Sequence, residues 1–284
     1  MIREPAVFDA FLARVRRFVR EIAIPAEEEV ERSGAIPEPI LEAMRKDGYF
    51  GWSIPAEHGG AGLTTEELVL AAFELSQCAV AFRARVGTNT GIGSEAIVAD
   101  GTEEQKRRYL PRLATGEWTG CLAVTEPDAG SEASNVRTTA VRDGQFYILD
   151  GEKCFITNAP LAHVFTVTAR TDPRSTGATG VSAFVVERDM RGLSTGTPYR
   201  KMGQVGSPVS AVHFNACRVP AAQLIGSREG AGFKTIMKVL NKQRSISLLC
   251  RRGRRSGCST WRSATRAVAF SSGSPLRTIS SCRR

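Results

Sequence analysis

The sequence predicts an α+β protein in which a helical N-terminal part is followed by a β-rich middle part and a return to helix. Residues 1–118 carry apolar side chains at helical spacing and two patterns typical of helix N-termini. From 119 to 226 the segments are short, rich in Val, Phe, Thr and Ile, and bounded by Gly, Asp, Asn or Pro. From 227 to 250 the apolar spacing is helical again.

Four helices are expected in the first part. The segment "FDAFLARVRRFVREI" has a helical apolar set: Phe8, Phe11, Leu12, Val15, Phe18, Val19 and Ile22. A second helix should begin after Pro37 and end at Gly48. Two more should begin with capping boxes, at Thr64 with Glu67 and at Thr102 with Gln105, the last of them closing at Gly116.

The middle part is expected to form short strands. They are "GCLAVTE", "TTAVRDGQFYILDGEKCFIT", "HVFTVTART", "GVSAFVVER" and "AVHFNACRVP", and "VRDGQF" is typical of a hairpin turn. The last helical stretch then has a periodic apolar set: Phe233, Ile236, Met237, Val239 and Leu240.

The net charge of +9 arises entirely from the last segment of the chain, residues 251–284. Residues 1–250 have 29 basic and 29 acidic side chains, whereas 251–284 has nine arginines and no Lys, Asp or Glu. The seven cysteines form no C-x-x-C pair, so neither a metal site nor a disulfide framework is expected. No apolar run is long enough to span a membrane, and a reducing cytoplasm is the expected location.

The stretch "LAVTEPDAGSEAS", residues 122–134, is the first candidate site. Pro127 and Gly130 predict a turn after a strand, where backbone can come close to a ligand and successive N–H groups can hold an anion. Ser131 adds a hydroxyl. The same shape also fits a strand-ending turn with no ligand.

The stretch "KCFITNAP", residues 153–160, is the second candidate site. Strand alternation places Phe155 and Thr157 on one face, which suits a flat heteroaromatic ring that needs an apolar wall and a hydrogen bond. Taken alone, Phe155 is better explained as a core residue.

Together the two stretches resemble the acyl-CoA dehydrogenase family, which reads T-E-P-x-A-G-S-D at the first and W-I-T-N at the second. The resemblance also covers "SIPAEHGGAGL", "GTEEQKRRYLPRLATGE", "YRKMGQVGSPVSAVHFNACRVPAAQLIG" and "GAGFKTIMKVLNKQR", in the family's order. It implies a helical N-terminal domain (1–118), a middle β-domain (119–226) and an incomplete C-terminal helical bundle (227–250), with FAD between the last two. Glu132 replaces the usual Asp, and Phe155 replaces the usual Trp.

The resemblance also implies which residues bind. Thr125 would reach the pyrimidine end of the flavin, Ser131 would lie near the pyrophosphate and the acyl-CoA, and the Thr157 hydroxyl near N5. The implied FAD-binding residues are Leu122, Val124, Thr125, Gly130, Ser131, Phe155, Ile156 and Thr157. The implied substrate-binding residues are Ser131, Asn241 and Arg244.

The family's reaction removes an α-proton and a β-hydride from an acyl-CoA, giving trans-2-enoyl-CoA and reduced FAD. A carboxylate base is required, and the family places it late in the bundle or, in some members, just before the Arg matched by Arg244. Gln243 stands there, and no acid follows Glu229. No catalytic residue is therefore assigned, and we expect weak or absent FAD retention and no turnover from the chain as written.

The segment 251–284 breaks the pattern, with eight serines and nine arginines in 34 residues. A frameshift near Cys250 is the favoured interpretation, since the resemblance stops inside a helix. A solvated disordered tail and a nucleic-acid-binding arm are the alternatives, the last being disfavoured.

The family further implies an electron-transfer flavoprotein-like acceptor and, for a complete bundle, a dimer or tetramer. The alternative function is a non-catalytic remnant that binds acyl-CoA or a partner.

Overall fold

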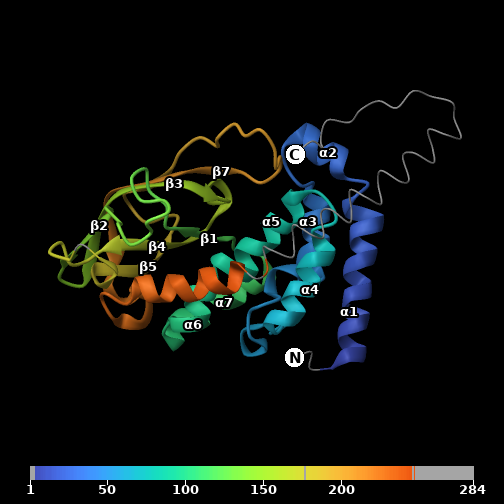
Figure 1. The fold of residues 1–284 in the computed structure, drawn as a ribbon, viewed down its shortest axis with the longest axis horizontal. Coiled ribbons are helices and arrows are strands. Elements are labelled where there is room, and N and C mark those ends of the chain that lie inside the picture. The colour runs from blue at the N-terminus through green and yellow to red at the C-terminus, as the bar shows by residue number, and fades with distance from the viewer. Residues whose placement is uncertain (1–3, 176, 245, 247–284) are drawn as a thin grey trace, which may run out of the picture.

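The computed structural model describes residues 4–175, 177–244 and 246 (Figure 1). The segment 251–284 lies outside the described residues, so the three interpretations of it stay predictions.

The first part of the chain is helical, as predicted. Both capping boxes form: the Thr64 hydroxyl accepts from the Glu67 N–H, and the Thr102 hydroxyl accepts from the Gln105 N–H. The α-helices are α1 (Pro5–Phe18), α2 (Glu27–Ser33), α3 (Glu38–Lys46), α4 (Thr65–Leu75), α5 (Val80–Gly87), α6 (Glu95–Asp100) and α7 (Glu103–Thr115). Shorter turns are η1 (Val19–Ala23), η2 (Tyr49–Gly51), η3 (Ala56–His58), η4 (Thr88–Ile92), η5 (Ala159–Leu161), η6 (Ala178–Gly180), η7 (Ala221–Gln223) and η8 (Ile225–Ser227).

One expected core residue of the first helix is exposed. Phe8, Leu12, Val15, Phe18 and Val19 are buried, but Ile22 is not. The reason is that α1 passes into the π-helix η1, whose wider turn rotates the following side chains away from the α-helical stripe.

The middle part is a β-domain, as predicted, and its sheet contains both parallel and antiparallel pairs. Its strands are β1 (Gly120–Ala123), β2 (Thr139–Asp143), β3 (Phe146–Thr157), β4 (Val164–Arg170), β5 (Val181–Glu187), β6 (Leu193–Thr195) and β7 (Val209–Pro220). The order is β1-β4-β2-β3-β7-β6, with β5 also paired to β4. The expected hairpin joins β2 to β3, with Asp143 opposite Phe146 and Gly144 at φ 57° in the turn. The three-residue β6 has no counterpart among the predicted strands.

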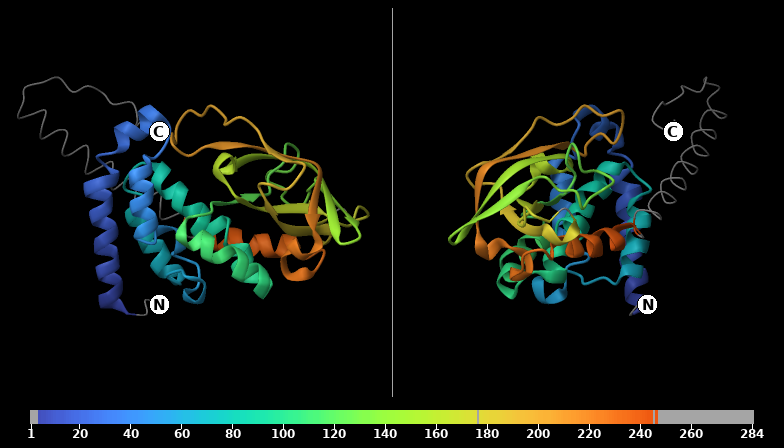
Figure 2. Two further views of the ribbon diagram at one scale, coloured as in Figure 1. Left: turned by 180° about the vertical axis from the view of Figure 1, so that it is seen from behind. Right: turned by 60° about the vertical axis from the view of Figure 1, so that its left-hand side comes forward.

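Three buried clusters hold these parts together. One lies among α1, α3, α4 and α5, and a second lies within the sheet. The third joins both domains: it contains Tyr109 and Leu113 of α7, Val164 of β4, Val185 of β5, and Val239. The helical domain and the sheet therefore share a buried cluster. The two further views in Figure 2 show the helices of the first part lying against the sheet.

The last described helix, 232–244, packs along α6 and α7 beneath the sheet (Figure 1). An incomplete bundle is expected to leave the apolar face of this helix unburied, and for Ile236 and Val239 that expectation is wrong. Both side chains are buried, Val239 within the third cluster, whereas Phe233, Met237 and Leu240 are half-buried. Among the described residues, no helix is long and apolar enough to cross a membrane.

Candidate functional site

The two candidate stretches lie side by side in the structure. The Cys154 N–H donates to the Thr125 carbonyl at 2.8 Å, which joins the segment just after β1 to the bulged part of β3. Strand β1 positions Leu122, which packs against the shared core, and leads into Val124 and Thr125, both half-buried. The sheet therefore brings the two motifs together, although they are 30 residues apart in the sequence.

The loop after Thr125 has free hydrogen-bond donors. Among the hydrogen bonds of the described residues, none uses the N–H of Gly130, the N–H of Ser131 or the Ser131 hydroxyl, and both residues are exposed. A Cβ added at Gly130 would meet nothing within 4 Å, and its φ is not in the left-handed region. Neither packing nor backbone conformation therefore requires glycine at 130, which leaves room for a ligand to approach. This arrangement fits a phosphate-bearing cofactor.

The second motif departs from a regular strand. A β-bulge lies between Lys153 and Ile156, and Phe155 has φ 58°. Simple alternation therefore does not apply, and it no longer places Phe155 and Thr157 on one face. The bulge leaves the Phe155 ring 67% exposed, against Tyr199 at a centroid distance of 5.4 Å.

The other residues of this motif face different surroundings. The Ile156 side chain is buried in the core of the sheet, so a ligand would meet only its backbone. Thr157 is half-buried opposite Val209. The Asn158 amide donates to the Ala84 carbonyl and to the Thr88 hydroxyl, which fixes the end of the motif to α5 and η4.

A buried ion pair lies behind both motifs. The Lys153 ammonium contacts the Glu126 carboxylate at 2.6 Å, and both side chains are nearly inaccessible. Burial lowers the pKa of Lys153 to about 8, against the opposing effect of Glu126. Burial alone would raise the pKa of Glu126, but Lys153 and the N–H donors around the carboxylate hold it below its usual value.

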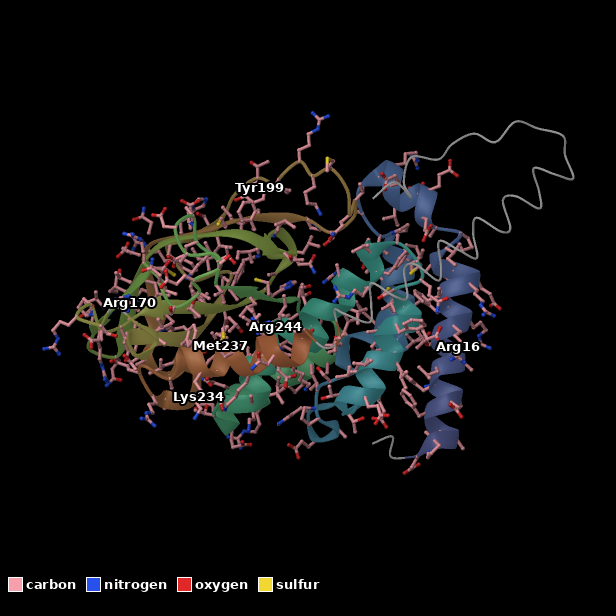
Figure 3. All side chains as sticks on the ribbon, in the orientation of Figure 1. Arg16, Arg170, Tyr199, Lys234, Met237 and Arg244 are labelled. Carbon is pink, nitrogen blue, oxygen red and sulfur yellow. The ribbon has the colours of Figure 1, made fainter. Side chains whose placement is uncertain are left out.

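The proposed substrate contacts lie on the last helix. Asn241 and Arg244 are exposed and hydrogen-bonded to each other at 3.0 Å. Figure 3 places Arg244 on the helix beneath the sheet and Tyr199 above the sheet. None of the hydrogen bonds of the described residues joins Ser131 to Asn241 or Arg244. The structure therefore brings together the predicted cofactor motifs, and it places the predicted CoA contacts on a separate element.

Gln243 faces η4. A Cβ on Gly91 would lie 2.6 Å from the Gln243 Nε2, so the carboxamide covers that glycine. The same Nε2 is buried and has no hydrogen-bond partner. Where the resemblance puts a base in some members, this chain has an amide that cannot accept a proton as a base.

Two other features of the described residues are separate from this site. A surface hollow of about 430 Å³ is lined by Arg107, Arg108, Pro111 and Arg112 of α7, and it shares no residue with the motifs. In the described ranges, no group of three His, Cys, Asp or Glu side chains is arranged to hold a metal ion.

Sequence reasoning missed the residues that support the motifs. They are Glu126, Lys153, Arg170 and Tyr199. The available signal was a pair of opposite charges, one inside each motif, next to residues expected to touch the ligand. Charged residues are almost never fully buried unless paired, so the two together indicated a buried pair.

The fold and the joined motifs define an α+β protein suited to hold a flat, phosphate-bearing cofactor against a sheet. "Acyl-CoA dehydrogenase, N-terminal domain" matches residues 8–117, and "Acyl-CoA dehydrogenase, middle domain" matches residues 121–217. A probable acyl-CoA dehydrogenase from Mycobacterium abscessus is 30% identical with a TM-score of 0.85, over 96% of this chain and 72% of that one. The chain belongs to the acyl-CoA dehydrogenase family of FAD-dependent oxidoreductases.

Two further relatives extend the comparison. An acyl-CoA dehydrogenase from Bacillus subtilis (strain 168) is 38% identical over 227 residues, which are 80% of this chain and 59% of that protein. A glutaryl-CoA dehydrogenase from Mycobacterium smegmatis in complex with FADH2 is 32% identical with a TM-score of 0.79, over 87% of this chain and 61% of that one. The chain thus spans about three-fifths of the length of these two relatives.

Proposed function

We propose that this chain carries the FAD-binding part of an enzyme that dehydrogenates an acyl-CoA thioester to a trans-2-enoyl-CoA. The observation that carries the proposal is the Cys154–Thr125 hydrogen bond, which unites a loop of free N–H groups with an exposed aromatic ring. When bound, FAD would accept the hydride from the β-carbon. The same proposal includes the domain boundaries, which lie between residues 118 and 119 and between residues 226 and 227.

The chain's own residues would bind and orient. Gly130 and Ser131 would donate backbone N–H groups to the pyrophosphate, and Phe155 would form a wall for the ring system. The half-buried Thr157 would offer its hydroxyl at the ring edge. Arg244, oriented by Asn241, would contact the CoA portion.

We also propose that this chain alone does not turn over acyl-CoA, and a non-catalytic role in binding acyl-CoA or a partner is the second candidate. The observation that favours it is Gln243, because its carboxamide stands where some members carry the base and it packs on Gly91. An electron-transfer flavoprotein-like acceptor and a dimer or tetramer belong to the complete enzyme in this proposal. The four cysteines of the described residues are free and buried, which supports a reducing, cytoplasmic location.

The test is a titration of the purified 284-residue chain with FAD, followed by addition of acyl-CoA substrates of several chain lengths. We expect weak, saturable FAD binding and no loss of the flavin's visible absorbance with any acyl-CoA. Absence of saturable FAD binding would overturn the cofactor assignment. Loss of flavin absorbance on adding an acyl-CoA would overturn the non-catalytic assignment.

A further inference from the structure

The ion pair between Lys153 and Glu126 connects the two motifs from behind. Glu126 directly follows Thr125, and Lys153 precedes Phe155 by two residues. The Lys153 ammonium donates to the Glu126 carboxylate at 2.6 Å, to the Val124 carbonyl at 3.3 Å and to the Thr168 hydroxyl at 3.2 Å. One ammonium therefore fixes the end of β1, the bulged part of β3 and a neighbouring position of β4.

The Glu126 carboxylate closes the loop that carries Gly130 and Ser131. It accepts the N–H of Arg137 at 2.6 Å and the N–H of Thr138 at 3.0 Å. Both ends of the loop are thus held by one side chain. The tip of the loop stays exposed and can meet a ligand.

Arg170 supports the far side of the same loop. From the end of β4, labelled in Figure 3, its guanidinium donates to the carbonyls of Ser134 at 3.0 Å and Val136 at 2.9 Å. The loop therefore rests on buried polar contacts, while the apolar core lies deeper in the sheet.

Stability alone is a weak reason for this arrangement. Removing two charges from water has a large desolvation cost, and apolar residues of similar volume often stabilise a protein as well or better. The pair does, however, specify geometry, because the ammonium and the carboxylate must meet with their backbone partners in place. Displacement of a binding group by about 1 Å can cost on the order of a hundredfold in function.

We propose that the Lys153–Glu126 pair positions the phosphate-binding loop relative to Phe155, so that the two motifs bind FAD together. This inference rests on the proposed function. Neither residue touches the cofactor, and both act through the segments that do.

Titration separates this role from a merely structural one. The groups facing the ammonium are the Glu126 carboxylate, the Val124 carbonyl, the Thr168 hydroxyl and the Cys154 thiol. Because the pKa of Lys153 is about 8, the bond to Glu126 loses its charge assistance above that pH. The unfolded chain keeps this proton to about pH 10.4, so the contribution of Lys153 to the free energy of unfolding rises with pH over that window. FAD affinity should fall over the same pH range, because the neutral Lys153 amine holds the two motifs in place less firmly.

The experiment compares the 284-residue chain with Lys153→Met, Glu126→Gln and the control Lys238→Met. The control removes a lysine from a partly exposed ion pair with Asp100, on the last helix and outside both motifs. FAD dissociation constants are measured at pH 7 and pH 9. Hydrogen exchange over 124–138 is measured without FAD at pH 7.

We expect Lys153→Met to weaken FAD binding at pH 7 by about tenfold or more and to speed exchange over 127–136. Glu126→Gln keeps an acceptor for the loop, so it should bind FAD less tightly than the wild type but still fold. The wild type should bind FAD more weakly at pH 9 than at pH 7, and Lys153→Met should lose this difference. The control should match the wild type in every measurement.

The positioning role is contradicted if Lys153→Met binds FAD with the affinity of the wild type. If Lys153→Met does not fold, the positioning role is contradicted if Glu126→Gln has the FAD affinity and the pH dependence of the wild type. If the wild-type chain itself binds no FAD, the proposed function fails. The exchange data then still test the pair, and unchanged exchange over 127–136 in both variants overturns it.

Discussion

At the scale of single residues, Phe155 combines two properties that packing within the protein does not explain. Its backbone lies at φ 58°, a conformation that costs on the order of 1–3 kcal/mol for a residue with a side chain. Its ring nevertheless stays largely exposed. A strained backbone that presents an apolar ring to solvent is expected where that ring serves a ligand.

Substitution of Phe155 by Ala tests this. Because the ring is exposed, the free energy of unfolding should change by no more than about 0.5 kcal/mol. FAD affinity should fall about tenfold or more, since burial of an aromatic ring contributes about 1.5–3 kcal/mol. Urea unfolding and FAD titration measure the two quantities. Met202→Ala is the control, because Met202 is fully exposed on the loop that carries Tyr199. Equal FAD affinity in both variants would exclude a wall role for Phe155.

Gly130 gives the complementary test. Open space surrounds the added Cβ and the backbone φ is ordinary, so Gly130→Ala should leave stability unchanged or raise it by up to about 1 kcal/mol. The extra methyl group should still weaken FAD binding severalfold, because it occupies the approach to the loop. Thermal unfolding and FAD titration are the measurements. Gly144→Ala, in the β2–β3 turn at φ 57°, should show the reverse pattern of lower stability and unchanged affinity.

At the scale of elements, three polar side chains of the last helix contact α6. The Thr235 hydroxyl and the Lys238 ammonium each donate to Asp100 at 2.6 Å. One turn further on, the Lys242 ammonium contacts both oxygens of Glu95, at 2.8 and 2.9 Å. These contacts flank the buried Ile236 and Val239, so the helix is held on the domain core by its own side chains.

Asp100→Asn should reveal this docking through its pH dependence. Burial raises the pKa of Asp100, but hydrogen bonds from Lys238 and Thr235 outweigh that effect and lower it overall. A carboxyl whose pKa is lowered on folding stabilises the protein above its unfolded pKa of about 3.9, and this stability is lost as the pH falls through the folded pKa. At pH 7 the free energy of unfolding of the wild type should therefore exceed that of Asp100→Asn by about 0.5–1 kcal/mol. The difference is modest because the ion pair is partly exposed. The difference should shrink as the pH falls below about 3.9 and disappear once the pH lies below the lowered pKa of the folded protein. Urea unfolding across pH 2–7 measures it, and a constant difference would contradict the ion-pair contribution.

At the scale of the whole molecule, the helical domain and the sheet behave as one packed body. Leu113 of α7, Val185 of β5 and Val239 of the last helix meet in a single buried cluster. A polar link crosses the same boundary: the Asn89 side-chain oxygen of η4 accepts the Gly120 N–H of β1. The motifs lie beside this boundary, so both domains position them.

Features of the structure that depend on interactions between neighbouring residues could be predicted from the sequence. The capping boxes, the β2–β3 turn and the apolar stripe of α1 depend on neighbouring residues, and sequence reasoning found them. The bulge at Phe155 and the burial of Lys153 depend on partners distant in sequence, and neither was predicted. The exposure of Ile22 is local, but the apolar spacing does not distinguish an α-helix from the π-helix η1 that causes it. The motifs were predicted to form a site, which stays a prediction, and the tertiary contacts that bring them together were not predicted.

The last prediction concerns the shared core. Val239→Ala removes buried methyl groups at the meeting point of both domains, so the free energy of unfolding should fall by about 2 kcal/mol. Met237→Ala, on a half-buried position of the same helix, should cost less than about 1 kcal/mol. Because the cluster contains residues of the helices and of the sheet, Val239→Ala should weaken both domains together. Hydrogen exchange in α7 and in β5, measured with increasing urea, should report the same loss for each. A loss confined to α7 would mean that the sheet is stable on its own and that its motifs do not depend on the last helix.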